Sequence, residues 1–187
     1  DIMGKDVRIK VEFSIGKGLY CAIQGDKKLD DNSIKLINKR MNDMVAADLP
    51  ITKKPYPIAE AVALFRQQGM EDKVNLFRYR RSSYINVYEL DGYYDYFYGY
   101  MLPSTGYIKY FQVFPYESGV LLLLPDKASP TQLELFEPRE KLFATLEAAN
   151  SWGEDLGIGT VGDLNNRICE GRLSDVILVQ EALQERR

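Results

Sequence analysis

The sequence predicts an α+β fold, in which an antiparallel sheet with packed helices is followed by a helical C-terminal tail. Three observations lead to this class. Apolar residues alternate with polar ones along residues 7–15, as in a half-buried strand. Four further extended segments follow one another between residues 82 and 124, separated by turn signals. From Arg139 onward, apolar residues recur at helical spacing.

The first part of the chain is expected to mix strands and helices. The turn Gly16-Lys17-Gly18 connects two strands and lacks the spacing of a phosphate-binding loop. Capping residues at 30–33 precede a helix that should end before Pro50, and Pro57 suits the first turn of another. In order, we expect strands over 7–15 and 19–24, a helix over 33–47, an extended piece over 51–56, and helices over 58–68 and 71–78.

The second part is expected to change from strands to helices. Its four predicted strands are 82–90, 93–99, 108–114 and 120–124, and its helices begin at 139, 161 and 174. Residues 126–138, with two prolines, read as a linker or surface loop. We therefore divide the chain into an α+β module over 1–125 and a helical extension over 126–187. The missing initiator methionine and the helix that continues to Arg187 indicate an excised portion of a longer protein.

The composition excludes several kinds of catalysis. The 187 residues include no histidine, so neither a Ser-His-Asp nor a Cys-His catalytic set can be built, and the commonest zinc ligand is missing. The two cysteines, Cys21 and Cys169, form no Cys-x-x-Cys pair and are expected to pack as apolar residues. No acidic cluster has metal-ligand spacing. The sequence thus predicts no catalytic residue and no metal ligand in this chain.

Charge and hydropathy also limit the expected partners. The formal net charge is −3, with acidic and basic residues interspersed, so we expect neither a nucleic-acid partner nor a membrane surface. No apolar run approaches the roughly 20 residues that a membrane-spanning helix needs. No signal peptide is visible, and a cytoplasmic location is the resulting expectation.

The segment Tyr93–Gly106, with the sequence YYDYFYGYMLPSTG, is the strongest candidate for a site. Its tyrosine rings could stack on a base, and its single carboxylate could accept hydrogen bonds from a sugar hydroxyl or an amine. On the inner face of a strand, that carboxylate would need a cationic partner, for which Arg78, Arg80 and Arg81 are the candidates. The competing interpretation is that the tyrosines only cover a sheet. The candidate ligand-binding residues are Asp95, Tyr98, Tyr100, Ser104, Thr105, Arg78 and Arg80.

Two smaller features each have two interpretations. The turn Pro103–Gly106 offers two hydroxyls and at least two free backbone N–H groups, which could bind a carboxylate or phosphate, but it could also be a plain connection between strands. The arginine cluster at 78–81 could contact an anionic ligand or an RNA backbone, but it could also be a solvated face.

The order of these elements resembles the second additional domain of threonyl-tRNA synthetases, which alanyl-tRNA synthetase editing domains share. The resemblance is sharpest at Asp95–Gly106, which is similar to the pattern D-x-C-x-G-x-H-x-P-S-T-G. Weaker similarity lies in Ile15–Tyr20, in the predicted helix with its ending Asp48–Ile51, and in Glu60–Phe65. Phe97 and Met101 stand at the cysteine and histidine positions of the pattern. Neither side chain can ligate a hard metal ion or move a proton, so hydrolytic editing is not expected.

A second resemblance is to bacterial uridine kinase-like nucleoside kinases. It rests on DYFYGYMLPSTGY, on Gly16–Cys21, and on Gly162–Asn165 with Glu181–Leu183. It implies a non-catalytic, ligand-binding or regulatory module that precedes a C-terminal P-loop kinase domain of the same chain. ATP and Mg²⁺ would then belong to that missing domain, this fragment would hold no cofactor, and its pocket would take a nucleoside or another small ligand. The alternative is a tRNA-associated domain of a synthetase or of a freestanding editing protein.

Overall fold

The computed structural model describes residues 2, 4, 7–25 and 29–185, and this part of the chain forms two compact units. Unit 1 combines Asp1–Ile51 with Leu102–Glu147, and unit 2 combines Thr52–Met101 with Ala148–Arg187. Each unit is therefore built from two separate segments of sequence. The sequence-based division at residue 125 follows a different criterion, and a module over 1–125 stays a prediction.

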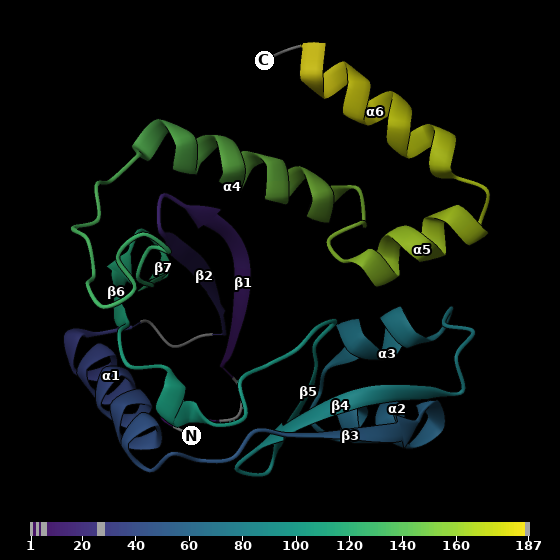
Figure 1. The fold of residues 1–187 in the computed structure, drawn as a ribbon. Helices are drawn as coiled ribbons and strands as arrows, with labels where there is room; N and C mark the ends of the chain where they lie inside the picture. The colour runs from purple at the N-terminus through teal and green to yellow at the C-terminus, as the bar shows by residue number, and fades with distance from the viewer. Residues whose placement is uncertain (1, 3, 5–6, 26–28, 186–187) are drawn as a thin grey trace. The chain divides into compact units, whose positions relative to one another are not determined.

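Unit 1 is built on a four-stranded antiparallel sheet with the order β1-β2-β7-β6 (Figure 1). Cys21 of β2 faces Val120 of β7, so the sheet joins the first and second segments of the unit. Asp30 caps the following helix by accepting a hydrogen bond from the Ser33 N–H at 2.8 Å. The elements are β1 (Arg8–Ile15), β2 (Gly18–Gln24), α1 (Asp31–Ala46), the 3₁₀ turn η1 (Thr105–Tyr107), β6 (Gln112–Tyr116) and β7 (Gly119–Leu123).

Two groups of buried side chains hold unit 1 together. One lies between the sheet and α1 and contains Cys21, Ile34, Val113 and Val120. The other is aromatic, and its centre is Phe143 from the start of α4 (Glu140–Asp155). The Phe143 ring contacts the rings of Phe13, Tyr20 and Tyr116 at centroid distances of 5.6, 4.8 and 5.4 Å. The beginning of the predicted helical tail thus completes the core of the first unit.

Unit 2 contains a three-stranded antiparallel sheet, β3-β4-β5, on which α2 packs. Its core consists of Ala61, Phe65, Phe77, Ile85 and Val87, with the half-buried Tyr94 and Tyr96 packed against it. The elements are β3 (Thr52–Pro57), α2 (Ile58–Gln67), α3 (Glu71–Phe77), β4 (Tyr84–Leu90), β5 (Tyr93–Tyr96), α5 (Val161–Cys169) and α6 (Leu173–Glu185).

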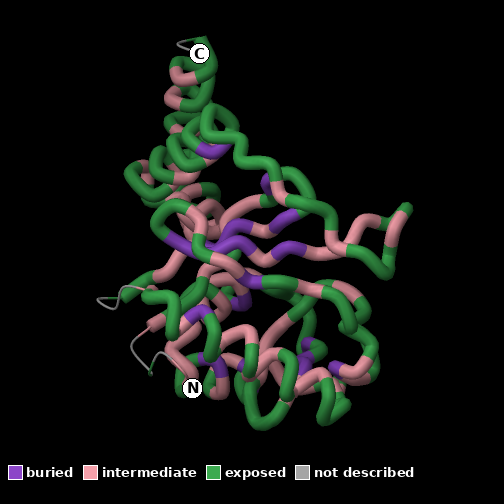
Figure 2. The backbone as a smooth tube through the Cα atoms, turned by 90° about the vertical axis from the view of Figure 1, so that its left-hand side faces the viewer, coloured by how far each residue is buried: buried purple, intermediate pink, exposed green. Residues whose placement is uncertain are grey.

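The later helices of unit 2 differ in how they are attached. Thr160 and Asp163 form a reciprocal capping box at the start of α5, and Tyr79 donates a hydrogen bond to Asn166 at 2.5 Å. Gly162 is buried against Asn75 of α3, where a Cβ atom would lie 2.9 Å from the asparagine side chain. By contrast, no residue of α6 is buried, and the chain near its C-terminus is exposed or intermediate in Figure 2.

The predicted α+β class is confirmed, but the strands are divided between two sheets, and β5 and β6 differ most from their predicted bounds. β5 ends at Tyr96, because the Asp95 carboxylate accepts a hydrogen bond from the Tyr96 N–H at 2.6 Å and the ladder stops there. β6 begins at Gln112 because η1 precedes it, and its Pro115 is tolerated on the edge of the sheet. Among the described helices, none combines the length and apolarity of a membrane span.

Replacing Phe143 by alanine should destabilise the protein by about 3–5 kcal/mol, because the residue is only 5% exposed and its ring fills the centre of the aromatic cluster. Its neighbour Leu142 is 40% exposed, so Leu142→Ala should change the free energy of unfolding by less than about 1 kcal/mol. Urea denaturation of the two variants and the parent measures both effects. Equal losses for the two variants would contradict the assignment of Phe143 to the core.

Candidate functional site

The loop Pro103–Gly106 of unit 1 is fastened to the end of α1 by a dense set of hydrogen bonds. The Thr105 hydroxyl donates to the Met44 carbonyl at 2.6 Å and accepts from the Leu49 N–H at 2.9 Å. The Thr105 N–H donates to the Leu49 carbonyl at 2.9 Å. Thr105 is 5% exposed, so these bonds satisfy a buried polar side chain.

Asp48 supplies the second part of this attachment. Its carboxylate accepts hydrogen bonds from the Ser104 hydroxyl and, at 3.0 Å, from the Gly106 N–H. A Cβ atom on Gly106 would collide with the same carboxylate, so a larger residue here would have to displace Asp48 from its hydrogen bonds. The N–H groups of Thr105 and Gly106 are therefore not free, contrary to the prediction, because both already donate within the protein. A ligand contact of Ser104 or Thr105 stays a prediction.

The Tyr93–Met101 segment of unit 2 begins as a strand and continues as an irregular segment. Tyr94 and Tyr96 face the core, whereas the Asp95 carboxylate forms an ion pair with Lys73 at 3.2 Å. The expected cationic partner was one of the arginines, but a lysine on α3 takes that place. No spacing in the sequence singles out Lys73, because the pairing depends on how α3 packs beside β5. The predicted ligand contact of Asp95 is untested.

The irregular segment that follows β5 has its backbone tied to β4, whereas its tyrosine side chains are exposed. The Tyr88 hydroxyl donates to the Gly99 carbonyl at 2.6 Å, which ties the segment to β4. Beyond this tie, the rings of Tyr98 and Tyr100 are 86% and 92% exposed. The nitrogen of Lys53 lies 4.6 Å from the Tyr100 ring centroid and 5.7 Å from that of Tyr88. A cation thus accompanies an exposed aromatic ring on this segment.

A second pairing of cation and ring lies at the end of β5. Arg80 donates a hydrogen bond to the Tyr96 hydroxyl at 2.6 Å, and its guanidinium lies 5.5 Å from the Tyr96 ring centroid. Arg78 lies 5.9 Å from the ring centroid of Tyr79. Both arginines are exposed, as is Arg81. Apart from Asp95, the predicted site residues of unit 2 are either exposed rings or cations that contact rings, and we call four of them, Arg78, Arg80, Tyr98 and Tyr100, together with Lys53, the aromatic–cation set.

The turn between β4 and β5 is fixed by one carboxylate. Glu89 accepts hydrogen bonds from the Gly92 N–H at 2.8 Å and from the Thr52 hydroxyl at 3.0 Å. These two donors, the backbone N–H first, lower the pKa of Glu89 below its ordinary value. The carboxylate therefore stays ionised at neutral pH and links β3 to the hairpin that carries the tyrosine segment.

The positions where the synthetase pattern has chemical groups carry exposed apolar side chains here. Phe97 and Met101 are 53% and 45% exposed, and neither can act as a base or hold zinc. Among the residues that the structure describes, no group of three or more His, Cys, Asp or Glu side chains is placed to hold a metal ion. The described part of unit 2 thus presents exposed aromatic rings and exposed cations.

Besides Lys73, sequence reasoning missed Lys53, Asp48 and Tyr88, which shape these features. Lys53 lies opposite Tyr88 in the β3–β4 register, so it could have been found only after the strands were paired. Asp48 stood in the helix-ending motif Asp48-Leu49-Pro50, but its backbone φ of 48° and its contacts with the distant loop leave no local pattern. Tyr88 lies in a predicted strand, and its hydrogen bond to Gly99 depends on the path of the chain after β5.

Comparisons with known proteins point to the aminoacyl-tRNA synthetases. The chain is 31% identical over 114 residues to the threonine–tRNA ligase of Syntrophotalea carbinolica. The aligned region covers 60% of this chain and 18% of that protein. The chain is 32% identical over 110 residues to threonine–tRNA ligase 1 of Bacillus subtilis, covering 58% of this chain and 17% of the relative. The similarity thus spans less than a fifth of each relative. No protein family model matches the chain.

These findings support the threonyl-tRNA synthetase resemblance and overturn the main functional prediction. The expectation of a uridine kinase fragment is wrong, because the relatives found are threonine–tRNA ligases and nothing in the comparisons supports a kinase. One of the phrases that suggested a kinase, DYFYGYMLPSTGY, lies in the same tyrosine segment and loop that carry the synthetase pattern. Over somewhat more than half of its length, the chain is threonyl-tRNA synthetase-like.

Replacing Thr105 by valine should destabilise the protein by about 1–3 kcal/mol, because the nearly isosteric change leaves the Met44 carbonyl and the Leu49 N–H without their buried partner. Thr145 provides a matched control, since its hydroxyl donates to the Lys141 carbonyl on an exposed part of α4. Thr145→Val should change the free energy of unfolding by no more than about 0.5 kcal/mol. Chemical denaturation compares the two, and a Thr105 variant as stable as its control would contradict the buried role.

Proposed function

We propose that this chain is a tRNA-associated module that binds RNA without hydrolysing it. The observation that carries the proposal is the similarity of 58–60% of the chain to threonine–tRNA ligases of two organisms. Proteins with that name act on tRNA, so an RNA ligand is the partner that the similarity favours. The module would recognise the RNA through the aromatic–cation set of unit 2.

The geometry of unit 2 supports binding of single-stranded RNA. Unstacked bases bind to exposed aromatic rings, and Lys or Arg side chains beside those rings contact the phosphates. Tyr98 and Tyr100 offer two rings that are almost fully exposed, and Lys53 lies against one of them. A segment tied to β4 through Gly99 presents these rings at low entropic cost.

Two differences from the synthetase pattern support the inference that the module does not cleave an ester. In the synthetase pattern, the chemical groups stand where this chain has Phe97 and Met101. The chain contains no histidine that could act as a base instead. What remains is the capacity to stack and to pair charges, which is sufficient for binding.

The net charge of −3 led to the opposite expectation, that nucleic acid is not a partner. A net charge averages over the whole surface, whereas phosphate contacts depend on local cations. Arg78, Arg80, Arg81 and Lys53 are all exposed in unit 2, which also carries the exposed rings, and Lys53 lies against the ring of Tyr100. Binding is expected to be modest in affinity and steeply dependent on salt.

The proposal is tested by titrating the protein with tRNA and with the same tRNA lacking its single-stranded 3′ end. Intact tRNA should bind more tightly, and the apparent association constant should fall linearly with salt on logarithmic axes. Arg78→Gln should weaken binding and lower the salt slope by about one unit. No binding of either RNA at low salt would exclude the function, and equal binding of both would exclude recognition of the 3′ end.

The double change Tyr98→Ala and Tyr100→Ala should weaken the binding of intact tRNA by about 1–3 kcal/mol for each ring that stacks on a base. Tyr107→Ala is the control, because Tyr107 is 63% exposed but lies on η1 in unit 1. Fluorescence anisotropy measures the three affinities. If the control loses as much affinity as the double variant, the aromatic–cation set is not the binding surface.

A further inference from the structure

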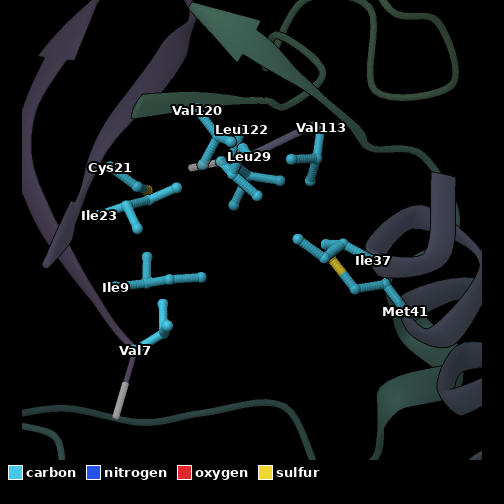
Figure 3. A pocket seen from close by; sticks show the side chains of 10 residues that line it. All are labelled: Val7, Ile9, Cys21, Ile23, Leu29, Ile37, Met41, Val113, Val120 and Leu122. Carbon is cyan, nitrogen blue, oxygen red and sulfur yellow. The ribbon is translucent and has the colours of Figure 1, made fainter. Parts of the chain in front are cut away.

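Unit 1 contains a pocket that the proposed function does not use. It lies between the sheet and α1, with Ile37 and Met41 of the helix opposite side chains of the strands (Figure 3). Its volume is about 130 Å³. The described residues that line it are Val7, Ile9, Cys21, Ile23, Leu29, Ile37, Met41, Val113, Val120 and Leu122.

The chemistry of this lining selects the kind of occupant. Every described lining residue is aliphatic or carries a sulfur atom, so the walls offer no charge and no strong hydrogen-bonding group. A charged or strongly polar molecule would lose its hydration without compensation there. A neutral apolar group is the occupant that fits.

The size of the pocket sets the size of that group. A cavity of about 150 Å³ lined by aliphatic and aromatic residues in a well-studied protein takes up benzene or xenon. At about 130 Å³, the pocket has room for one six-membered ring or a short alkyl chain.

The pocket also has a route of entry at the edge of the sheet. β1 is an edge strand, paired only with β2 among the described strands. Ile9 of β1 lines the pocket and is nevertheless 53% exposed. The pocket therefore reaches the solvent beside Ile9, and a small molecule can enter there.

We propose that this pocket binds one small neutral apolar molecule or group, of the size of a benzene ring or a short alkyl chain. The site is separate from the aromatic–cation set, which belongs to unit 2. An anion or a nucleotide would not enter it. Its occupation therefore does not depend on whether the chain binds RNA.

Cys21 makes the pocket accessible to a chemical measurement. Its thiol is 5% exposed and lies in the pocket wall, and burial raises its pKa above the ordinary value. The thiol therefore stays protonated at neutral pH and should react slowly with charged reagents. Cys169 is exposed, so Cys169→Ser leaves Cys21 as the one thiol in the chain.

The test is a titration of the full chain with benzene, followed by NMR of its methyl groups, with benzoate as the charged counterpart. Benzene should bind saturably and shift the methyl signals of Val120 and Ile37, whereas benzoate should leave them unchanged. Ile37→Phe fills the pocket and should abolish the benzene response. Leu36→Phe, at a neighbouring position of α1 that is 45% exposed, should keep it.

A second readout does not depend on whether the filled variant folds. In the Cys169→Ser background, the small neutral reagent methyl methanethiolsulfonate should modify Cys21, and saturating benzene should slow this reaction. A lack of saturable benzene binding would overturn the proposal. Equal binding of benzoate, or unchanged modification of Cys21 with benzene present, would overturn it as well.

Discussion

The buried hydroxyl of Thr105 is the constraint on which the arrangement of unit 1 depends. It joins Met44, near the end of α1, and Leu49, just after it, to a loop that lies 61 and 56 positions later in the sequence. Beside it, the Ile51 N–H donates to the Pro103 carbonyl at 2.9 Å. The chain leaves unit 1 after Ile51 and returns at Leu102, so this set of hydrogen bonds fixes both its departure and its return. The main role of the loop residues in this structure is therefore to hold the two segments of unit 1 together.

This assignment separates two halves of a motif that is continuous in sequence. In Pro103–Gly106, both hydroxyls and two of the N–H groups form hydrogen bonds within the protein. The preceding Phe97–Met101 is tied through Gly99 and exposes its aromatic rings. An element that hydrolyses an ester needs a base and a polarised water, and neither half supplies one. Exposed rings beside cations are instead suited to binding single-stranded RNA, whose bases stack on the rings and whose phosphates pair with the cations.

Local patterns predicted most elements, because each depends on nearby residues. Alternation along 7–15 gave β1, and Gly159-Thr160 marked the start of α5, where Thr160 forms a capping box. The sequence did not reveal what depends on pairing across long distances. The division into two sheets, the ion pair of Lys73 with Asp95 and the contact of Lys53 with Tyr100 all follow from tertiary packing. Short motifs shared by different families also misdirected the functional prediction toward a kinase.

The construction of both units from two chain segments has a consequence for the order of folding. The sheet of unit 1 cannot close until β7 reaches β2, and its aromatic core waits for Phe143. Contacts between such distant residues slow folding, because a long loop must be ordered first. During synthesis, β2 emerges together with its partner β1 but well before its other partner, the apolar β7. A nascent chain therefore carries unpaired strand edges for longer than one built from contiguous domains, which makes aggregation the competing process.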